Sequence, residues 1–343
     1  MHSNRIPVRN VYYLLCYAWN QLEQGALIDV SRVQTTSLVD LFASVLCDGL
    51  DHIARRGMQQ GYQAKEEEVS SIRGRVDLIA SARRLLLVHG RALCRFDELS
   101  ADTLPNRIIK ATLRALLKQT EDERLQSRVR VLYRSLREIT DIELSTSVFR
   151  RVQLSSNERF YRFLMHVCEF VHGCWLVDSE SGHSRFRDFI RDEAAMARLF
   201  ERFAYNFARV EVRSWVVSRE EIPWAASSET DSALSLLPKM RTDIVLRRGS
   251  DCRIVDAKYY QQTTSRYYDT EKLHSANLYQ LLSYVSNAHA RERGTVSGML
   301  LYPRVERTLR ERYTIRGHEI RISTVDLSAE WRDVRRELLE LFV

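Results

Sequence analysis

Apolar residues recur at helical spacing over much of the chain. After Pro7, the spacing i, i+3, i+4, i+7 predicts a helix whose buried face carries Val11, Leu14, Leu15 and Ala18. The same periodicity predicts further helices over residues 36–56, 105–119, 122–137, 159–175 and 193–211. Residues 62–95 are different: polar and apolar positions alternate around Gly74, a pattern that predicts strands with a bend.

A β-hairpin is predicted near the middle of the C-terminal half. Two short apolar runs, residues 242–246 and 252–260, flank a turn at Gly249. The elements predicted after it are a helix over residues 270–290, strands over 295–302 and 319–327, and a helix over 328–342 with Ser328 as its N-cap. The whole pattern predicts an α+β protein, with a mixed helical and β domain over residues 1–180 followed by an α/β domain over residues 181–343.

Three charged residues stand where this hairpin should contribute to a core. Asp243 lies in the first run, and Asp256 and Lys258 lie near the end of the second. Because alternate residues of a strand face the same side, Asp256 and Lys258 should project together, with Ala257 turned away. Pairing of the two runs would bring Asp243 close to Asp256. Since an Asp buried without a partner costs several kcal/mol, the placement favours a chemical role.

Two converging carboxylates could hold a hard cation such as Mg²⁺, which prefers oxygen ligands. A water acidified by the cation can attack a phosphate in line, and Lys258 could orient that water or offset charge on the phosphate. The alternative is a solvated strand edge, because Asp-x-Lys alone is a weak signal. The apolar residues before Asp256 favour burial, and therefore the metal site.

A second polar pair lies on the helix predicted over residues 270–290. Gln280 and Tyr284 are four residues apart and share one face of that helix. Beside the hairpin, an amide and a phenol could hydrogen-bond a phosphate or position Lys258. Away from the hairpin, the pair would be ordinary surface decoration.

Composition narrows the class of protein. The chain has 343 residues, 45% hydrophobic and 28% charged, which fits a globular protein large enough for two domains. Its net charge of +7 comes mainly from arginine and suits contacts with phosphate. The six cysteines include no Cys-x-x-Cys pair, which favours a reduced, cytoplasmic setting over a zinc or redox motif. No apolar run is long enough to span a membrane, and no P-loop motif occurs, so nucleotide hydrolysis would require a partner.

The hairpin, followed by Gln280 and Tyr284, resembles the active-site motif of the PD-(D/E)xK nucleases. Beyond this motif, the chain resembles the McrC family almost from end to end. The stretches that carry the resemblance are Ile-Pro-Val-Arg-Asn-Val-Tyr-Tyr at 6–13, Gly-Arg-Val at 74–76, the block 96–108, Asp-Ala-Lys-Tyr-Tyr at 256–260 and Asn-Leu-Tyr-Gln at 277–280.

The resemblance implies the endonuclease subunit of a methylcytosine-dependent, type IV restriction system that serves antiviral defence. Such a subunit would hydrolyse phosphodiester bonds of double-stranded DNA containing methylated cytosine, with Mg²⁺ as cofactor. Its partner would be a McrB-type hexameric AAA+ GTPase. Residues 1–180 would bind that ring and stimulate GTP hydrolysis, and residues 181–343 would form a restriction-endonuclease-like PD-(D/E)xK domain.

The resemblance also implies roles for individual residues. The implied catalytic residues are Asp243, Asp256, Lys258, Gln280 and Tyr284. The implied metal ligands are Asp243, Asp256 and the backbone carbonyl of Ala257. Some nucleases of this superfamily add a Glu from the preceding helix. Glu201 is a candidate, but its helical phase lies off the apolar stripe, so its participation stays open.

Two other functions stay open as well. One is a regulatory DNA-binding or ring-binding subunit whose nuclease site is inactive, and the other is a stand-alone DNA nuclease. The first would show no Mg²⁺-dependent nicking even with its GTPase, whereas the second would cut DNA alone. The bend over residues 72–76 is the candidate for an element that projects into the ring, with ordinary sheet packing as the alternative.

Overall fold

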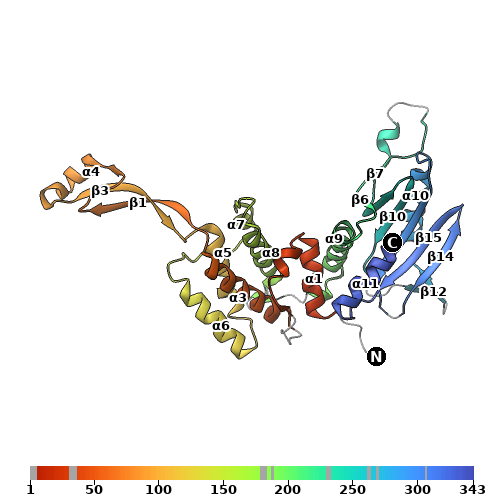
Figure 1. The fold of residues 1–343 in the computed structure, drawn as a ribbon, viewed down its shortest axis with the longest axis horizontal. Helices are drawn as coiled ribbons and strands as arrows, with labels where there is room; N and C mark the ends of the chain where they lie inside the picture. The colour runs from red at the N-terminus through yellow and green to blue at the C-terminus, as the bar shows by residue number, and fades with distance from the viewer. Residues whose placement is uncertain are drawn as a thin grey trace. The chain divides into compact units, whose positions relative to one another are not determined.

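The chain forms two compact units in the computed structural model, which describes residues 6–30, 37–177, 184–186, 189–228, 233–260, 264–267, 270–305 and 307–343. Unit 1 comprises Met1–Thr36 and Asp188–Val343, and unit 2 comprises Ser37–Arg187 (Figure 1). In this division the first 36 residues group with the C-terminal part of the chain, whereas the sequence predicted domains over residues 1–180 and 181–343.

Aromatic packing explains why the N-terminal helix joins unit 1. Helix α1 (Val8–Ala18) packs against α9 (Glu193–Glu211). The ring of Tyr17 lies 5.7 Å from that of Phe203 and 5.3 Å from that of Phe207, measured between centroids. The Tyr17 hydroxyl donates to the Glu211 carboxylate at 2.6 Å. These contacts connect residues that lie far apart in the sequence, Tyr17 and Glu211 being 194 positions apart, so local periodicity cannot reveal them.

Unit 2 combines a group of helices with a three-stranded antiparallel sheet. Its helices are α3 (Leu38–Arg56), α4 (Leu78–Arg83), α5 (Leu104–Leu116), α6 (Glu123–Ser135), α7 (Thr146–Arg150) and α8 (Arg159–Gly173). The sheet has the order β1-β3-β2, with β1 (Gly61–Val69), β2 (Arg75–Val76) and β3 (Ala92–Ser100); β4 (Trp175–Val177) and β5 (Ser184–Phe186) form a separate pair. Figure 1 shows β1 and β3 extending away from the helices of this unit, with α4 at the far end.

The predicted bend at Gly74 is confirmed. Gly74 has a φ of +67°, and a Cβ at this position would collide with the carbonyl oxygen of Arg95 and with Phe96. Only glycine fits both the backbone conformation and the space. The bend lets the chain between β1 and β3 fold back as β2, α4 and the 3₁₀ helix η2 (Leu86–His89).

Unit 1 is built on a six-stranded mixed sheet with the order β14-β15-β13-β10-β9-β6. These strands are β6 (Val216–Ser218), β9 (Ile244–Arg248), β10 (Asp251–Ala257), β13 (Val296–Pro303), β14 (Arg310–Ile315) and β15 (His318–Val325). Strand β10 is antiparallel to β9 and parallel to β13, with Asp256 opposite Leu300. Shorter pairs are β7 (Glu221–Ile222) with β8 (Met240–Arg241), and β11 (Thr264–Tyr267) with β12 (Thr270–Leu273).

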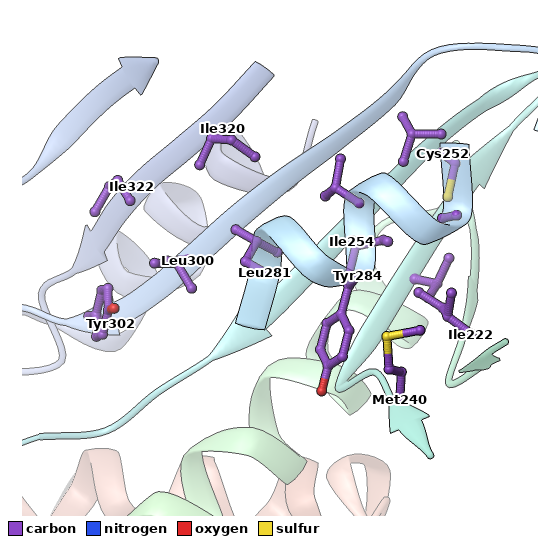
Figure 2. Packing of buried hydrophobic residues seen from close by; sticks show 14 of the residues in the cluster. Ile222, Met240, Cys252, Ile254, Leu281, Tyr284, Leu300, Tyr302, Ile320 and Ile322 are labelled. Atoms are coloured by element: carbon purple, nitrogen blue, oxygen red, sulfur yellow. The ribbon is translucent and has the colours of Figure 1, made fainter. Parts of the chain in front are cut away.

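Helices cover both faces of this sheet. Helix α10 (Ser275–His289) packs on the face that carries Ile254, where a buried cluster also includes Leu281 and Leu300 (Figure 2). Arg253, the residue before Ile254, points to the opposite face of the sheet. It donates from Nη1 to the Phe342 carbonyl at 3.0 Å, which shows that helix α11 (Trp331–Phe342) packs on that other face. Helices α9 and α10 both contact β10, the strand that carries Asp256.

Two of the predicted boundaries were wrong, and several strands were not predicted, β14 among them. The helix expected over residues 270–290 begins only at Ser275, because the residues before it pair as β12. Ser328 does not cap the last helix; its hydroxyl donates to Asp326 Oδ1 at 2.6 Å, and Glu330 takes the N-cap position. Strand β14 was missed because its residues are mostly exposed and carry no apolar alternation. Within the described ranges, no helix has the length and apolar content of a membrane span.

Candidate active site

The β9–β10 hairpin brings the two carboxylates together. Asp243 precedes β9 and Asp256 lies near the end of β10, and Ile244 is the register partner of Val255. The Ala257 backbone N–H donates to Asp243 Oδ2 at 2.9 Å, which fixes the side chain beside the end of β10. Asp256 is 1% exposed, so its carboxylate lies inside the protein.

Lys258 completes this group from the same strand end. Its backbone N–H donates to the Leu301 carbonyl at 2.9 Å, which continues the pairing of β10 with β13 by one residue. Its Nζ lies 3.1 Å from Asp256 Oδ1, and its side chain is 23% exposed. Asp256 and Lys258 therefore project to the same side, and the ammonium is partly open to solvent.

The electrostatics of the three groups are strongly perturbed. Burial raises the pKa of Asp243 to about 6, and the nearby charge of Asp256 acts in the same direction, while Lys258 opposes both. Burial also raises the pKa of Asp256, while the charge of Lys258 and its hydrogen bond to Asp256 oppose this rise. Burial alone would lower the pKa of Lys258, but Asp256 and Asp243 outweigh it and raise that pKa. Shifts of this kind in neighbouring groups are typical of functional sites.

One oxygen of the pair has no partner in the protein. Asp256 Oδ2 is fully buried with no N–H or hydroxyl donor of a described residue beside it, and the neighbouring Asp243 carboxyl can donate to Asp256 only when it is protonated. A buried carboxylate oxygen normally has a donor or a cation beside it. No group of three Asp, Glu, His or Cys side chains suited to a metal occurs among the described residues. A cation here would therefore take two carboxylates and complete its shell with backbone oxygen and water, which is how Mg²⁺ is usually held.

The predicted pair on α10 lies near these charges. Gln280 Nε2 donates to the Tyr284 hydroxyl oxygen at 2.7 Å, and Tyr284 is 6% exposed. Burial raises the pKa of Tyr284, and the charges of Asp256 and Asp243 add to that shift. Figure 2 shows the Tyr284 side chain projecting from α10 with its hydroxyl at the far end. Since Gln280 donates to it, the phenol keeps its own proton for another acceptor.

Glu201 of α9, which the sequence left open, lies beside the same site. Burial and the charge of Asp243 raise the pKa of Glu201, and Lys258 opposes them. Its carboxylate pairs with Arg219 at 3.0 Å. Glu201, Arg219, Thr242 and Asp243 all line one open pocket of about 330 Å³. The position off the apolar stripe, which counted against Glu201 in the sequence, is what turns its carboxylate toward the edge of the sheet.

Comparisons with known proteins agree with the resemblance seen in the sequence. The family described as the McrBC 5-methylcytosine restriction system component matches residues 3–303. The Escherichia coli (strain K12) protein described as type IV methyl-directed restriction enzyme EcoKMcrBC is 38% identical over 343 residues, covering 100% of this chain and 99% of its own length. A chain from the Thermococcus gammatolerans assembly of McrB AAA+ hexamers with bound McrC has a similar fold, with a TM-score of 0.62 and 21% identity; the match covers 98% of this chain and 76% of that one. The chain therefore belongs to the McrC family of McrBC 5-methylcytosine restriction system components.

Proposed function

We propose that this chain is the Mg²⁺-dependent endonuclease subunit of a methylcytosine-dependent restriction complex, which cuts double-stranded DNA in the cytoplasm together with a McrB-type AAA+ GTPase. The observation that carries the proposal is the burial of Asp243 and Asp256 together, with one Asp256 oxygen lacking a partner and Lys258 at 3.1 Å. Two carboxylates buried side by side repel each other when both are ionised, and a bound cation would offset that repulsion. The Escherichia coli relative is described as a type IV methyl-directed restriction enzyme, which supports the reaction, and the similar Thermococcus gammatolerans chain comes from an assembly with McrB AAA+ hexamers, which supports the partner.

Each residue has a distinct task in this proposal. Asp243 and Asp256, with the Ala257 carbonyl, would hold Mg²⁺, and the Ala257 N–H keeps Asp243 Oδ2 in place. When bound, the cation supplies an acidified water and a positive charge that attracts the phosphate. Lys258 has three N–H donors, so it can bond Asp256 and still donate to the attacking water or a phosphate oxygen.

The α10 pair would act on the substrate side. Gln280 orients the Tyr284 hydroxyl through the 2.7 Å bond, and that hydroxyl can then donate to a phosphate oxygen or to a carboxylate of the site. Glu201 lies close enough to influence Asp256 electrostatically and would add a third acidic group at the edge of the site.

Unit 2 supplies a surface suited to the GTPase ring. The segment between β1 and β3, here called the tip (residues 70–91), exposes large apolar side chains. Those more than half exposed are Ile72, Leu78, Ile79, Leu85, Leu87 and Val88. Exposed apolar residues gathered at the end of an extended strand pair mark an interaction site in a protein that is otherwise ordinary in composition. We assign the tip to contact with the ring and to stimulation of GTP hydrolysis.

A cleavage assay tests the nuclease proposal directly. Methylated and unmethylated DNA would be incubated with this chain, with and without the McrB-type GTPase, GTP and Mg²⁺. We expect cutting only of methylated DNA and only with all components. Asp256→Ala should abolish cutting while stimulation of the GTPase stays intact, whereas Asp333→Asn, an exposed control on α11, should change neither.

The same assay separates the alternatives. No Mg²⁺-dependent cutting by the complete complex would favour a regulatory subunit with an inactive site. Cutting by this chain alone would favour a stand-alone nuclease. Loss of GTPase stimulation in a folded Asp256→Ala protein would contradict the division of tasks between the two units.

A further inference from the structure

A buried amide joins two tyrosines close to the end of β10. The Tyr260 hydroxyl donates to Asn277 Oδ1 at 3.1 Å, and Asn277 Nδ2 donates to the Tyr302 hydroxyl oxygen at 3.1 Å. Asn277 is 5% exposed and Tyr302 is fully buried. The three residues come from the segment after β10, from the first turn of α10 and from β13, so two hydrogen bonds connect three separate elements.

These bonds hold the chain just beyond Lys258. The regular strand β10 ends at Ala257, and the Lys258 N–H makes one more backbone bond to Leu301. Two residues later, the Tyr260 ring stacks on the His274 ring, with centroids 4.4 Å apart and planes at 29°. The side chain of Tyr260 therefore fixes the backbone at the point where the chain leaves the sheet.

Asn277 and Tyr302 are buried, where polar atoms need partners and apolar side chains do not, so their presence requires an explanation. Buried hydrogen-bonded groups add little net stability, but they select one arrangement, because any other leaves a polar atom unsatisfied. The arrangement selected here places Lys258 so that its ammonium reaches Asp256 Oδ1 at 3.1 Å. Catalytic groups need such precision, since a displacement of about 1 Å can lower a rate on the order of 100-fold.

We propose that Asn277 and Tyr260 are positioning residues of the nuclease site, which together hold the backbone of Lys258 so that its ammonium stays beside Asp256. The proposal rests on the proposed nuclease function, but the anchor itself is a property of the fold. Neither residue touches the phosphate or the metal ligands in this scheme. They act through Lys258 alone.

Tyr260→Phe is the most selective test, because it removes the hydroxyl and keeps the ring on His274. In the complete complex with the GTPase, GTP and Mg²⁺, we expect kcat for cleavage to fall about 10- to 100-fold at unchanged KM for DNA. Asn277→Leu should have an equal or larger effect, because it removes both hydrogen bonds. Tyr313→Phe on the edge strand β14, where the tyrosine is 45% exposed, is the matched control and should cleave normally.

Hydrogen–deuterium exchange of the full chain provides a readout that does not depend on cleavage. In Tyr260→Phe, the Lys258 amide should exchange at least tenfold faster, while the amides of the preceding residues of β10 keep their protection. Unchanged exchange at Lys258, or cleavage at the wild-type rate, would overturn the proposal. If the wild-type complex does not cut DNA at all, the nuclease function fails, and the exchange at Lys258 still decides whether the anchor exists.

Discussion

Replacing one carboxylate of the site should stabilise the metal-free protein. Asp243→Asn keeps the size of the side chain and an oxygen that can accept from the Ala257 N–H. It also places an amide donor toward Asp256, whose Oδ2 has no partner in the protein. Repulsion between two buried carboxylates becomes a hydrogen bond, and the protein becomes more stable as it loses its proposed metal ligand.

The size of the effect follows from the pKa of Asp243. Burial and Asp256 raise this pKa from 3.8 to about 6. At about 1.4 kcal/mol per pKa unit, ionised Asp243 destabilises the folded state by about 3 kcal/mol near pH 7.5. The folded state binds this proton more tightly than the unfolded state. The contribution of protonated Asp243 to the free energy of unfolding is therefore fully present below pH 3.8 and is lost as the pH rises through about 6. The variant should therefore gain about 1 to 3 kcal/mol above pH 6 and nothing near pH 4.

Denaturant unfolding followed by tryptophan fluorescence measures this difference. Four of the five tryptophans, Trp19, Trp215, Trp224 and Trp331, belong to unit 1, so the signal reports mainly on the unit that contains the site. Titration with Mg²⁺ gives a second measurement. A ligand at 100 times its Kd stabilises a folded protein by about 2.7 kcal/mol, so wild type should gain stability with Mg²⁺ and the variant much less.

Two results would refute this reasoning. Equal stability of wild type and Asp243→Asn at pH 7.5 without divalent ions would mean that the two carboxylates do not repel each other as their burial requires. Equal stabilisation of both proteins by Mg²⁺ would mean that Asp243 is not a ligand. Asp333→Asn, which removes an exposed carboxylate on α11, controls for the change in net charge.

The remaining predictions concern the tip and the edge of the site. Replacing Ile79 and Val88 with Ser should reduce stimulation of the partner's GTPase at least tenfold without changing the stability of unit 1, because both side chains are more than 65% exposed; unchanged stimulation would remove the tip from the interface. Gly74→Ala should destabilise the tip by about 1 to 3 kcal/mol, because the added Cβ would collide with the Arg95 carbonyl oxygen and Phe96 at a φ of +67° that other residues rarely adopt, and amide exchange in β3 would detect the loss. Glu201→Gln should slow cleavage about tenfold or more and leave GTPase stimulation intact if Glu201 takes part, in contrast to the exposed control Glu193→Gln on the same helix.

Several features of the site could be predicted because they depend on neighbouring residues. Asp256 and Lys258 share one side of a strand whatever the strand pairs with, and Gln280 and Tyr284 share one face of any helix. Gly74 likewise predicted a bend, because glycine readily adopts backbone conformations that few other residues adopt. Each of these conclusions needs only the geometry of a strand, a helix or a turn.

Other features of the site could not be predicted, because they join distant segments. The sequence placed Glu201 off the apolar stripe of its helix, and only the fold brings it close to Asp243. The sequence indicated no hydrogen-bond partners for Asn277, which the fold brings between Tyr260 and Tyr302. The apolar side chains of the tip would suit a buried core equally well, so their exposure could not be predicted from the sequence.

The sequence by itself therefore determined the longer helices, the central strands of the sheet in unit 1 and the types of chemical group at the candidate site, since these follow from the spacing of residues along the backbone. The tertiary structure decided that α1 belongs with the C-terminal unit, that Asp243 meets Asp256 across the hairpin, and that a buried amide holds the strand end at Lys258. Those contacts depend on which surfaces pack together once loops close, a balance of burial and chain entropy over the whole fold that the pattern within any one segment does not contain.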